Sequence, residues 1–202
     1  MTNRVRSREI GRLNAFTDGV MVVSMTLLIL NIELPGNILG LDGARLLHAL
    51  AALWPKYLGY VLSFVVIGQY WLGYTRQFGG MRAADEGFAQ LNILFLLVIG
   101  FIPFATALIS RNDGGIATSV YAATMMAASA LLLVLWLYAV RKGLVEPSEP
   151  PGRRWREMSR GIEVLAVFAA SIVVAQYDSN LARWMWVLLA VPILPRAAAK
   201  AA

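Results

Sequence analysis

Six stretches without a charged residue run through the sequence, and they constrain its fold more than any other feature. They lie at residues 19–32, 57–75, 87–110, 114–140, 164–177 and 184–195. A helix rises about 1.5 Å per residue, so it needs about 20 apolar residues to cross the hydrocarbon core of a bilayer. The three stretches between residues 57 and 140 reach or approach that length, whereas the others need their polar flanks drawn inward.

We therefore predict an all-α integral membrane protein with six transmembrane helices in a single domain, residues 1–202. The expected spans are approximately 13–34, 54–76, 87–110, 115–141, 159–177 and 182–196. The uncharged parts of the last two spans are short. A re-entrant or interfacial hairpin is the alternative for that pair.

The composition agrees with a membrane protein. Mean hydropathy is +0.62, 58% of the residues are hydrophobic and 15% are charged. These values are too apolar for an ordinary soluble domain. The net charge of +6 could suggest nucleic-acid binding, but the basic residues lie between the apolar stretches rather than along one helical face. We expect membrane lipid, and no nucleic acid, as a partner.

The sequence shows no machinery for catalysis. It has no cysteine and one histidine, His48, which stands in an amphipathic stretch without neighbours that could complete a metal site. No nucleophile–base pair, Gly-rich phosphate loop or HExxH spacing is present. We predict that the chain is not an enzyme and that it has neither a metal site nor a cofactor.

The distribution of Lys and Arg predicts the orientation. With six spans, 14 of the 18 basic residues fall on the side of the N-terminus and 4 on the opposite side. Basic segments resist translocation, so the side richer in Lys and Arg is cytoplasmic. We therefore predict that both termini are cytoplasmic. The six tryptophans stand mostly near the ends of the spans, as in an interfacial aromatic belt.

The first apolar stretch and its lead-in carry a signature. It reads Arg12, three further residues, then Phe16-Thr17-Asp18-Gly19-Val20, and later Thr26-Leu27-Leu28-Ile29-Leu30. This pattern resembles the Arg…Phe-Ser-Asp signature of the endosomal and lysosomal potassium channel family, transmembrane protein 175, and its bacterial homologues. Later pairs agree, up to about Thr106: Ser63-Phe64, Tyr70-Trp71, Gln77-Phe78, Leu91-Asn92 and Pro103-Phe104.

The resemblance implies a channel of a bacterial inner (cell) membrane. Its subunit would have six helices and assemble as a homotetramer, with the first helices around the pore and potassium passing without a carbonyl filter. Two departures are visible. Thr17 replaces the Ser of the signature and keeps the hydroxyl, and Tyr74-Thr75 stands where relatives often have His, which argues against a proton-sensing role there.

Two stripes of the first span could face a pore. The apolar stripe consists of Val20, Val23, Leu27, Leu30 and Leu34. The polar stripe, rotated by about 80°, consists of Thr17, Ser24 and Asn31. A polar lining would supply oxygen ligands, while an apolar ring would act by dewetting and by constricting a partly dehydrated ion.

The residues alone favour lipid contact or packing as the role of the apolar stripe. The resemblance instead favours this stripe as the pore lining, with the constriction at Val23, Leu27 and Leu30. Further residues that could line the pore are Val20, Ser24, Thr26, Asn31 and Leu34. Relatives carry a larger Ile or Leu at the position of Val23, so we predict weaker discrimination between cations.

The signature residues Arg12, Phe16, Thr17 and Asp18 are expected to lock the cytoplasmic end of the first span. Asp18 could be an ion or proton site. It could also be a structural carboxylate, paired with Arg12 or with polar groups of the second and third spans such as Asn92. We expect the structural role, because carboxylates within membranes generally pair.

We predict a potassium-preferring cation channel with passive, leak-type conduction of monovalent cations, in which K⁺ is the permeant ion. The alternative is a small non-channel transporter, or an enzyme acting on lipid at the membrane face, with Arg12 and Asp18 as its polar site. A transporter usually shows paired broken helices in repeated halves. A lipid enzyme should show several acidic or His residues near one interface, and neither pattern is convincing here.

Overall fold

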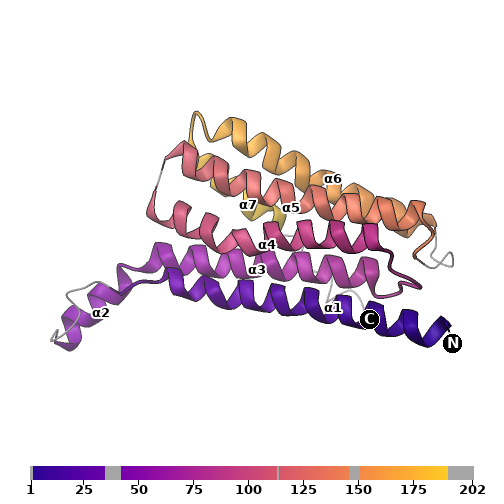
Figure 1. Cartoon of the computed structure of the whole chain (residues 1–202). Helices are drawn as coiled ribbons and strands as arrows, with labels where there is room; N and C mark the ends of the chain where they lie inside the picture. The colour runs from indigo at the N-terminus through magenta and orange to yellow at the C-terminus, as the bar shows by residue number, and fades with distance from the viewer. Residues whose placement is uncertain (1, 35–41, 113, 146–150, 191–202) are drawn as a thin grey trace, which may run out of the picture.

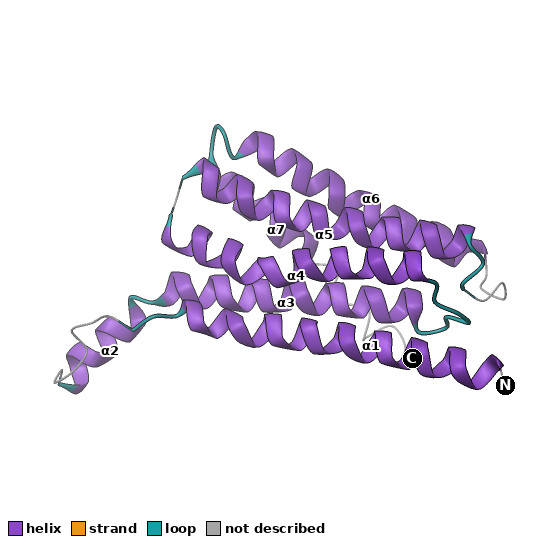
Figure 2. Ribbon diagram, viewed as in Figure 1, coloured by secondary structure: helices purple, strands orange, loops and turns teal. Residues whose placement is uncertain are grey.

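The computed structural model describes residues 2–34, 42–112, 114–145 and 151–190, with side chains at 9–34, 42–112, 114–145, 159 and 161–186. The described chain is built from helices joined by loops (Figure 1, Figure 2). Its elements are α1 (Thr2–Leu27), the 3₁₀-helix η1 (Leu28–Asn31), α2 (Gly43–Ala51), α3 (Trp54–Phe78), α4 (Glu86–Arg111), α5 (Gly115–Arg141), α6 (Pro151–Val174) and α7 (Ser179–Ala190). Within the described residues, the β-pairing is one isolated bridge, Met81–Val145.

Local chemistry explains where the helices of the bundle begin and end. The side chain of Asp85 caps α4 by accepting a hydrogen bond from the backbone N–H of Phe88 at 2.8 Å. Past the end of α5, Gly143 adopts a positive φ of 66°. The N–H of Leu144 then reaches back to the carbonyl of Ala139 at 2.9 Å, the pattern that closes a helix with a left-handed residue.

Three helical segments of the described part are long and apolar enough to cross a membrane: Glu9–Asn31, Glu86–Arg111 and Gly115–Arg141. The pair α2 and α3, bent by 48°, makes a fourth candidate, and α6 contains the shorter apolar helix Gly161–Val174. The prediction of an all-α membrane protein is confirmed, whereas the count of six spans stays a prediction. The predicted end of the sixth span, 191–196, lies outside the described residues.

The centre of the bundle is α4, which packs against α1, α3 and α5, while α6 and α7 pack against α5. Figure 1 shows α1 at one edge and α6 at the opposite edge. Fully buried side chains fill the space between the helices, among them Phe78, Phe88, Phe95, Ile99 and Met125. Because α1 is an edge helix, only one of its faces packs on the bundle in a single subunit.

One helix stands apart from this packing. Figure 1 shows α2 extending away from the bundle, beyond the ends of α1 and α3. None of the residues of α2 is buried, and His48 is exposed. The bundle that carries the candidate site therefore consists of α1 and η1 with α3 to α7.

Candidate functional site: the first helix

The two sides of α1 and η1 differ sharply in exposure. Thr17, Met21, Ser24 and Leu28 are at most 2% exposed and form the side that packs on α3 and α4. Their spacing of three or four residues places them on one helical face. On the other side, the exposed fractions are 54% for Val23, 42% for Leu27, 68% for Leu30 and 60% for Leu34. Val20 lies between the two sides and is half-buried.

The polar stripe is bonded within the subunit. The hydroxyl of Thr17 accepts a hydrogen bond from the side-chain amide of Asn92 at 2.8 Å. Ser24 donates to the carbonyl of Val20 at 2.8 Å, and the amide of Asn31 donates to the carbonyl of Pro103 at 3.0 Å. These three side chains therefore act as polar contacts within α1 or between α1 and α4, as small polar groups in membrane helices commonly do.

Among the side chains described from residue 9 onward, the exposed side of α1 has one hydroxyl, Thr26, whose Oγ1 donates to the carbonyl of Val23 at 2.9 Å. Because that bond is made within the helix, this side remains chiefly apolar. At about 100° per residue, Arg12 and Phe16 lie within about 20° of Val23 on the same helical face. Both are exposed; Phe16 extends the apolar stripe toward the N-terminus of α1, and Arg12 places a charge at its end.

Asp18 has a partner that the sequence-based prediction did not name. The indole N–H of Trp71 on α3 donates to Oδ1 of Asp18 at 2.8 Å. Asn92, one of the expected partners, is instead bonded to Thr17. Arg12 and Asp18 are not paired with each other, since the salt bridges among the described residues lie elsewhere. The signature residues thus tie α1 to α3 through Asp18 and to α4 through Thr17.

As one of the six tryptophans near span ends, Trp71 is expected in an interfacial aromatic belt and not beside Asp18. A Trp carries a single N–H donor that usually finds a partner, and this one stands in the pair Tyr70-Trp71 of the second span. That donor was the available signal. Its connection to Asp18 was hidden, because the two residues are 53 positions apart.

A second set of contacts fixes the opposite end of this segment. Glu33 forms an ion pair with Arg111 at the end of α4. Close by in sequence, the carbonyl of Asn112 accepts a hydrogen bond from the guanidinium of Arg183 on α7 at 3.1 Å. The end of η1, the end of α4 and the start of α7 are therefore linked.

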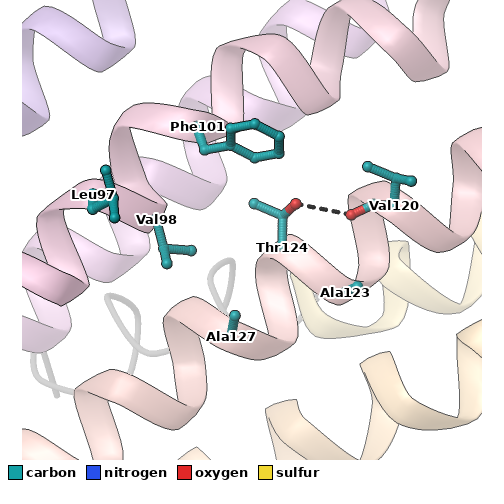
Figure 3. Close-up of a pocket in the computed structure, with 7 residues that line it drawn as sticks. All are labelled: Leu97, Val98, Phe101, Val120, Ala123, Thr124 and Ala127. Carbon is teal, nitrogen blue, oxygen red and sulfur yellow. Dashed lines mark hydrogen bonds between the residues drawn. The ribbon is translucent and has the colours of Figure 1, made fainter.

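The structure offers little that could hold a metal ion or a small polar substrate. Among the described residues, no group of three or more His, Cys, Asp or Glu side chains could bind a metal ion. An open groove of about 540 Å³ lies between α4 and α5 (Figure 3). Its lining is Leu97, Val98, Phe101, Val120, Ala123, Thr124 and Ala127. The one hydroxyl there, on Thr124, donates to the carbonyl of Val120 at 2.8 Å, so the groove presents an apolar surface.

Comparison with known proteins matches this part of the chain to one family. The family model described as the endosomal/lysosomal potassium channel TMEM175 matches residues 12–103. A potassium channel of Streptomyces collinus is 38% identical over 141 residues, which are 67% of this chain and 66% of that relative. A potassium channel of Chamaesiphon minutus is 34% identical over 143 residues, 69% of this chain and 70% of that relative.

More distant relatives and a solved structure agree. The endosomal/lysosomal proton channel TMEM175 of Mus musculus is 35% identical over 99 residues, 46% of this chain and 20% of the mouse protein. The crystal structure of a lysosomal potassium-selective channel TMEM175 homologue from Chamaesiphon minutus superposes with a TM-score of 0.80 at 26% identity. That superposition covers 95% of this chain and 99% of the solved one.

The fold and these similarities define the class as a helical integral membrane protein of the ion-channel type. The chain belongs to the family of the endosomal/lysosomal potassium channel TMEM175. The resemblance stated from the sequence is therefore confirmed. The family is one of channels, so the alternative of an enzyme acting on lipid is set aside and the prediction that the chain is not an enzyme is confirmed.

Proposed function

We propose that this chain is the subunit of a potassium-preferring cation channel with passive conduction. Four copies assemble around a pore in a cell membrane, each with six spans and both termini in the cytoplasm. The apolar stripe of α1 and η1 faces the pore, and Val23, Leu27 and Leu30 form its constriction. One observation carries the proposal: the polar stripe is bonded inside the subunit, so the free side of the edge helix is the apolar one.

Charged side chains mark one end of the exposed side. Glu9 and Arg12 are exposed in the single subunit and lie on the same helical face as Val23. Both precede the expected span, residues 13–34, so in the proposed pore they lie at its cytoplasmic mouth. Charged groups there face water rather than acyl chains.

An apolar constriction can favour the passage of potassium without binding it. A narrow hydrophobic ring disfavours water, so an ion that passes must shed part of its hydration shell. K⁺ holds its water less tightly than Na⁺, and partial dehydration therefore penalises Na⁺ more. Val23 is smaller than Leu27 and Leu30. We therefore expect modest selectivity, set mainly by the two leucines.

The names of the relatives suggest two candidates for the permeant ion, potassium and the proton. The bacterial relatives are named potassium channels, and the mouse relative is named a proton channel. The bacterial matches extend over about two thirds of this chain, whereas the mouse match covers 46% of it. We therefore propose potassium as the permeant ion and include protons in the test.

The test uses the purified full chain in vesicles, with K⁺, Na⁺ and H⁺ fluxes measured separately. Leu30→Ala and Leu97→Ala form a matched pair, because Leu30 and Leu97 are 68% and 69% exposed but lie on different helices. We expect Leu30→Ala to lower the K⁺/Na⁺ permeability ratio and Leu97→Ala to leave it unchanged. Equal effects of the two substitutions, or flux that saturates like a carrier, would contradict the pore.

The number of copies is tested separately, by native mass spectrometry of the chain in detergent or nanodiscs. We expect four copies per particle. A monomer that still conducts K⁺ would contradict a pore built from the first helices of several subunits.

A further inference from the structure

The apolar stripe crosses a change of helix type. α1 ends at Leu27, and the chain continues as the 3₁₀-helix η1 over Leu28–Asn31. Three residues of an α-helix turn the chain by about 300°, whereas three residues of a 3₁₀-helix turn it by about 360°. The tighter winding therefore places Leu30 at the same angular position as Leu27. In a continued α-helix, Leu30 would lie about 60° away from Leu27 around the axis.

A 3₁₀ turn at the end of an α-helix is common, but this one is fastened to a neighbouring helix. Asn31, its last residue, donates its side-chain amide to the carbonyl of Pro103 at 3.0 Å. Ile32 has already left the helical conformation, with φ −88° and ψ 79°. Asn31 is therefore the last helical residue of this segment, and its side chain holds η1 against α4.

The acceptor of that bond lies in a rigid part of the bundle. Pro103 is buried inside α4, where its ring removes one backbone hydrogen bond of the helix and locally distorts it. Leu28, at the start of η1, is fully buried. One end of η1 is thus fixed by packing at Leu28 and the other by the hydrogen bond of Asn31.

We infer that Asn31 is a positioning residue of the channel: its hydrogen bond to Pro103 maintains the 3₁₀ winding and so keeps Leu30 in line with Leu27. This inference rests on the proposed pore. Leu30 forms the outer ring of the constriction because it is held there, and not by its own packing, since it is 68% exposed. Without the bond, η1 relaxes toward α-helical winding. Leu30 then turns by about 60° away from Leu27, to within about 20° of Val23, so the two leucines no longer lie in line.

The experiment measures reversal potentials under K⁺/Na⁺ gradients, a property of each open channel that does not depend on how many channels fold. The variants are Asn31→Ala and Asn31→Leu, and the second keeps the side-chain bulk but has no donor. We expect both to lower the K⁺/Na⁺ permeability ratio by about threefold, the population ratio that one interhelical hydrogen bond in a membrane controls on average. The matched control is Ser110→Ala, which removes a side-chain bond to the carbonyl of Ala107 within α4 and should leave the ratio unchanged.

A second arm separates positioning from a general structural effect. Asn31→Ala is combined with Leu30→Ala, which removes the side chain that Asn31 is inferred to position. We expect no further change in the permeability ratio in the double variant. An equal change in the presence and absence of Leu30 would overturn the inference. So would Asn31 variants whose permeability ratio equals that of the control Ser110→Ala.

The outcomes distinguish this inference from the proposed function. If Leu30→Ala alters selectivity and the Asn31 variants do not, the pore stands and the inference fails. If the chain does not conduct, or Leu30→Ala behaves like Leu97→Ala, both fail together.

Discussion

The indole N–H of Trp71 lies 2.8 Å from Oδ1 of Asp18, and this bond joins α3 to the signature segment of α1. Asp18 is exposed in the single subunit and Trp71 is partly exposed, so the bond lies at the rim of the packed face rather than within it. A hydrogen bond to a charged acceptor is stronger than one between neutral groups. The carboxylate of Asp18 is therefore held by a hydrogen bond from Trp71 and is not without a partner in the subunit.

Removal of the Trp71 donor should weaken the fold or the assembly without changing selectivity. For Trp71→Phe we expect a loss of about 1 kcal/mol, because the bond is partly exposed to solvent. This corresponds to a melting temperature lower by about 2–4 °C for a chain of this size. The control is Trp54→Phe, an exposed Trp at the start of the same helix. A changed K⁺/Na⁺ ratio in Trp71→Phe would instead place Asp18 on the ion path.

The hydrogen bond between Thr17 and Asn92 should be stabilising in the membrane. Both residues are fully buried, and Thr17→Val leaves the side-chain amide of Asn92 without its acceptor. We expect a loss of about 1–3 kcal/mol of unfolding free energy, measured by denaturation in detergent micelles. Thr17→Ser keeps the hydroxyl and should lose much less. If Thr17→Val and Thr17→Ser prove equally stable, the hydrogen bond contributes nothing measurable.

The side chain of Tyr138 on α5 lies against Gly87 near the start of α4. A Cβ added at Gly87 would lie 2.3 Å from Oη of Tyr138, whose hydroxyl donates to Asp85 at 2.9 Å. Gly87→Ala should therefore displace Tyr138 and destabilise the subunit by about 1–3 kcal/mol.

The control for that prediction lies on the same helix. A Cβ added at Gly100 meets no atom within 4 Å, so Gly100→Ala should be neutral or stabilising in a thermal melt. In the Tyr138→Phe background the clashing hydroxyl is absent, and Gly87→Ala should lose less stability there. An undiminished loss in that background would assign the effect to something other than Tyr138.

The small side chain at position 23 should limit selectivity. Val23→Ile adds a methylene to the proposed constriction, and we expect a higher K⁺/Na⁺ permeability ratio with a lower conductance. Val22→Ile is the matched control, since Val22 is 57% exposed and Val23 is 54% exposed but the two lie about 100° apart on the helix. Reversal potentials that change equally for both variants would argue against Val23 as part of the constriction.

The all-helical fold and the existence of a polar stripe on the first helix follow from sequence patterns. The heptad spacing of Thr17, Ser24 and Asn31 defined a polar stripe, and all three side chains prove to be hydrogen-bonded within the subunit. The pattern could not decide which stripe packs inward, because either stripe suits a membrane helix. That choice depends on acceptors such as Pro103, which is 72 positions from Asn31.

Other features depended on three-dimensional proximity that spacing does not encode. The Asp18–Trp71 pair joins two spans, and a charge beside an apolar run predicts only that some partner exists. The bend of 48° between α2 and α3 was not predicted either. Turn-forming residues indicate where a helix ends, but they do not give the angle between that helix and the following helix. The length of their apolar stretches predicts α4 and α5 well, since each stretch is long enough to cross the membrane by itself.

The bonds of the signature segment also bear on how this sequence can change over evolution. Thr17, Asp18 and Asn31 all reach α3 or α4, and the family model ends at residue 103, within α4. The three helices that follow pack on this unit or on one another, in addition to forming hydrogen bonds such as that from Tyr138 to Asp85, and many combinations of apolar side chains satisfy packing. Substitutions should therefore accumulate more freely after residue 111 than before it. Related sequences would then share residues in α1 to α4 and differ mainly in α5 to α7.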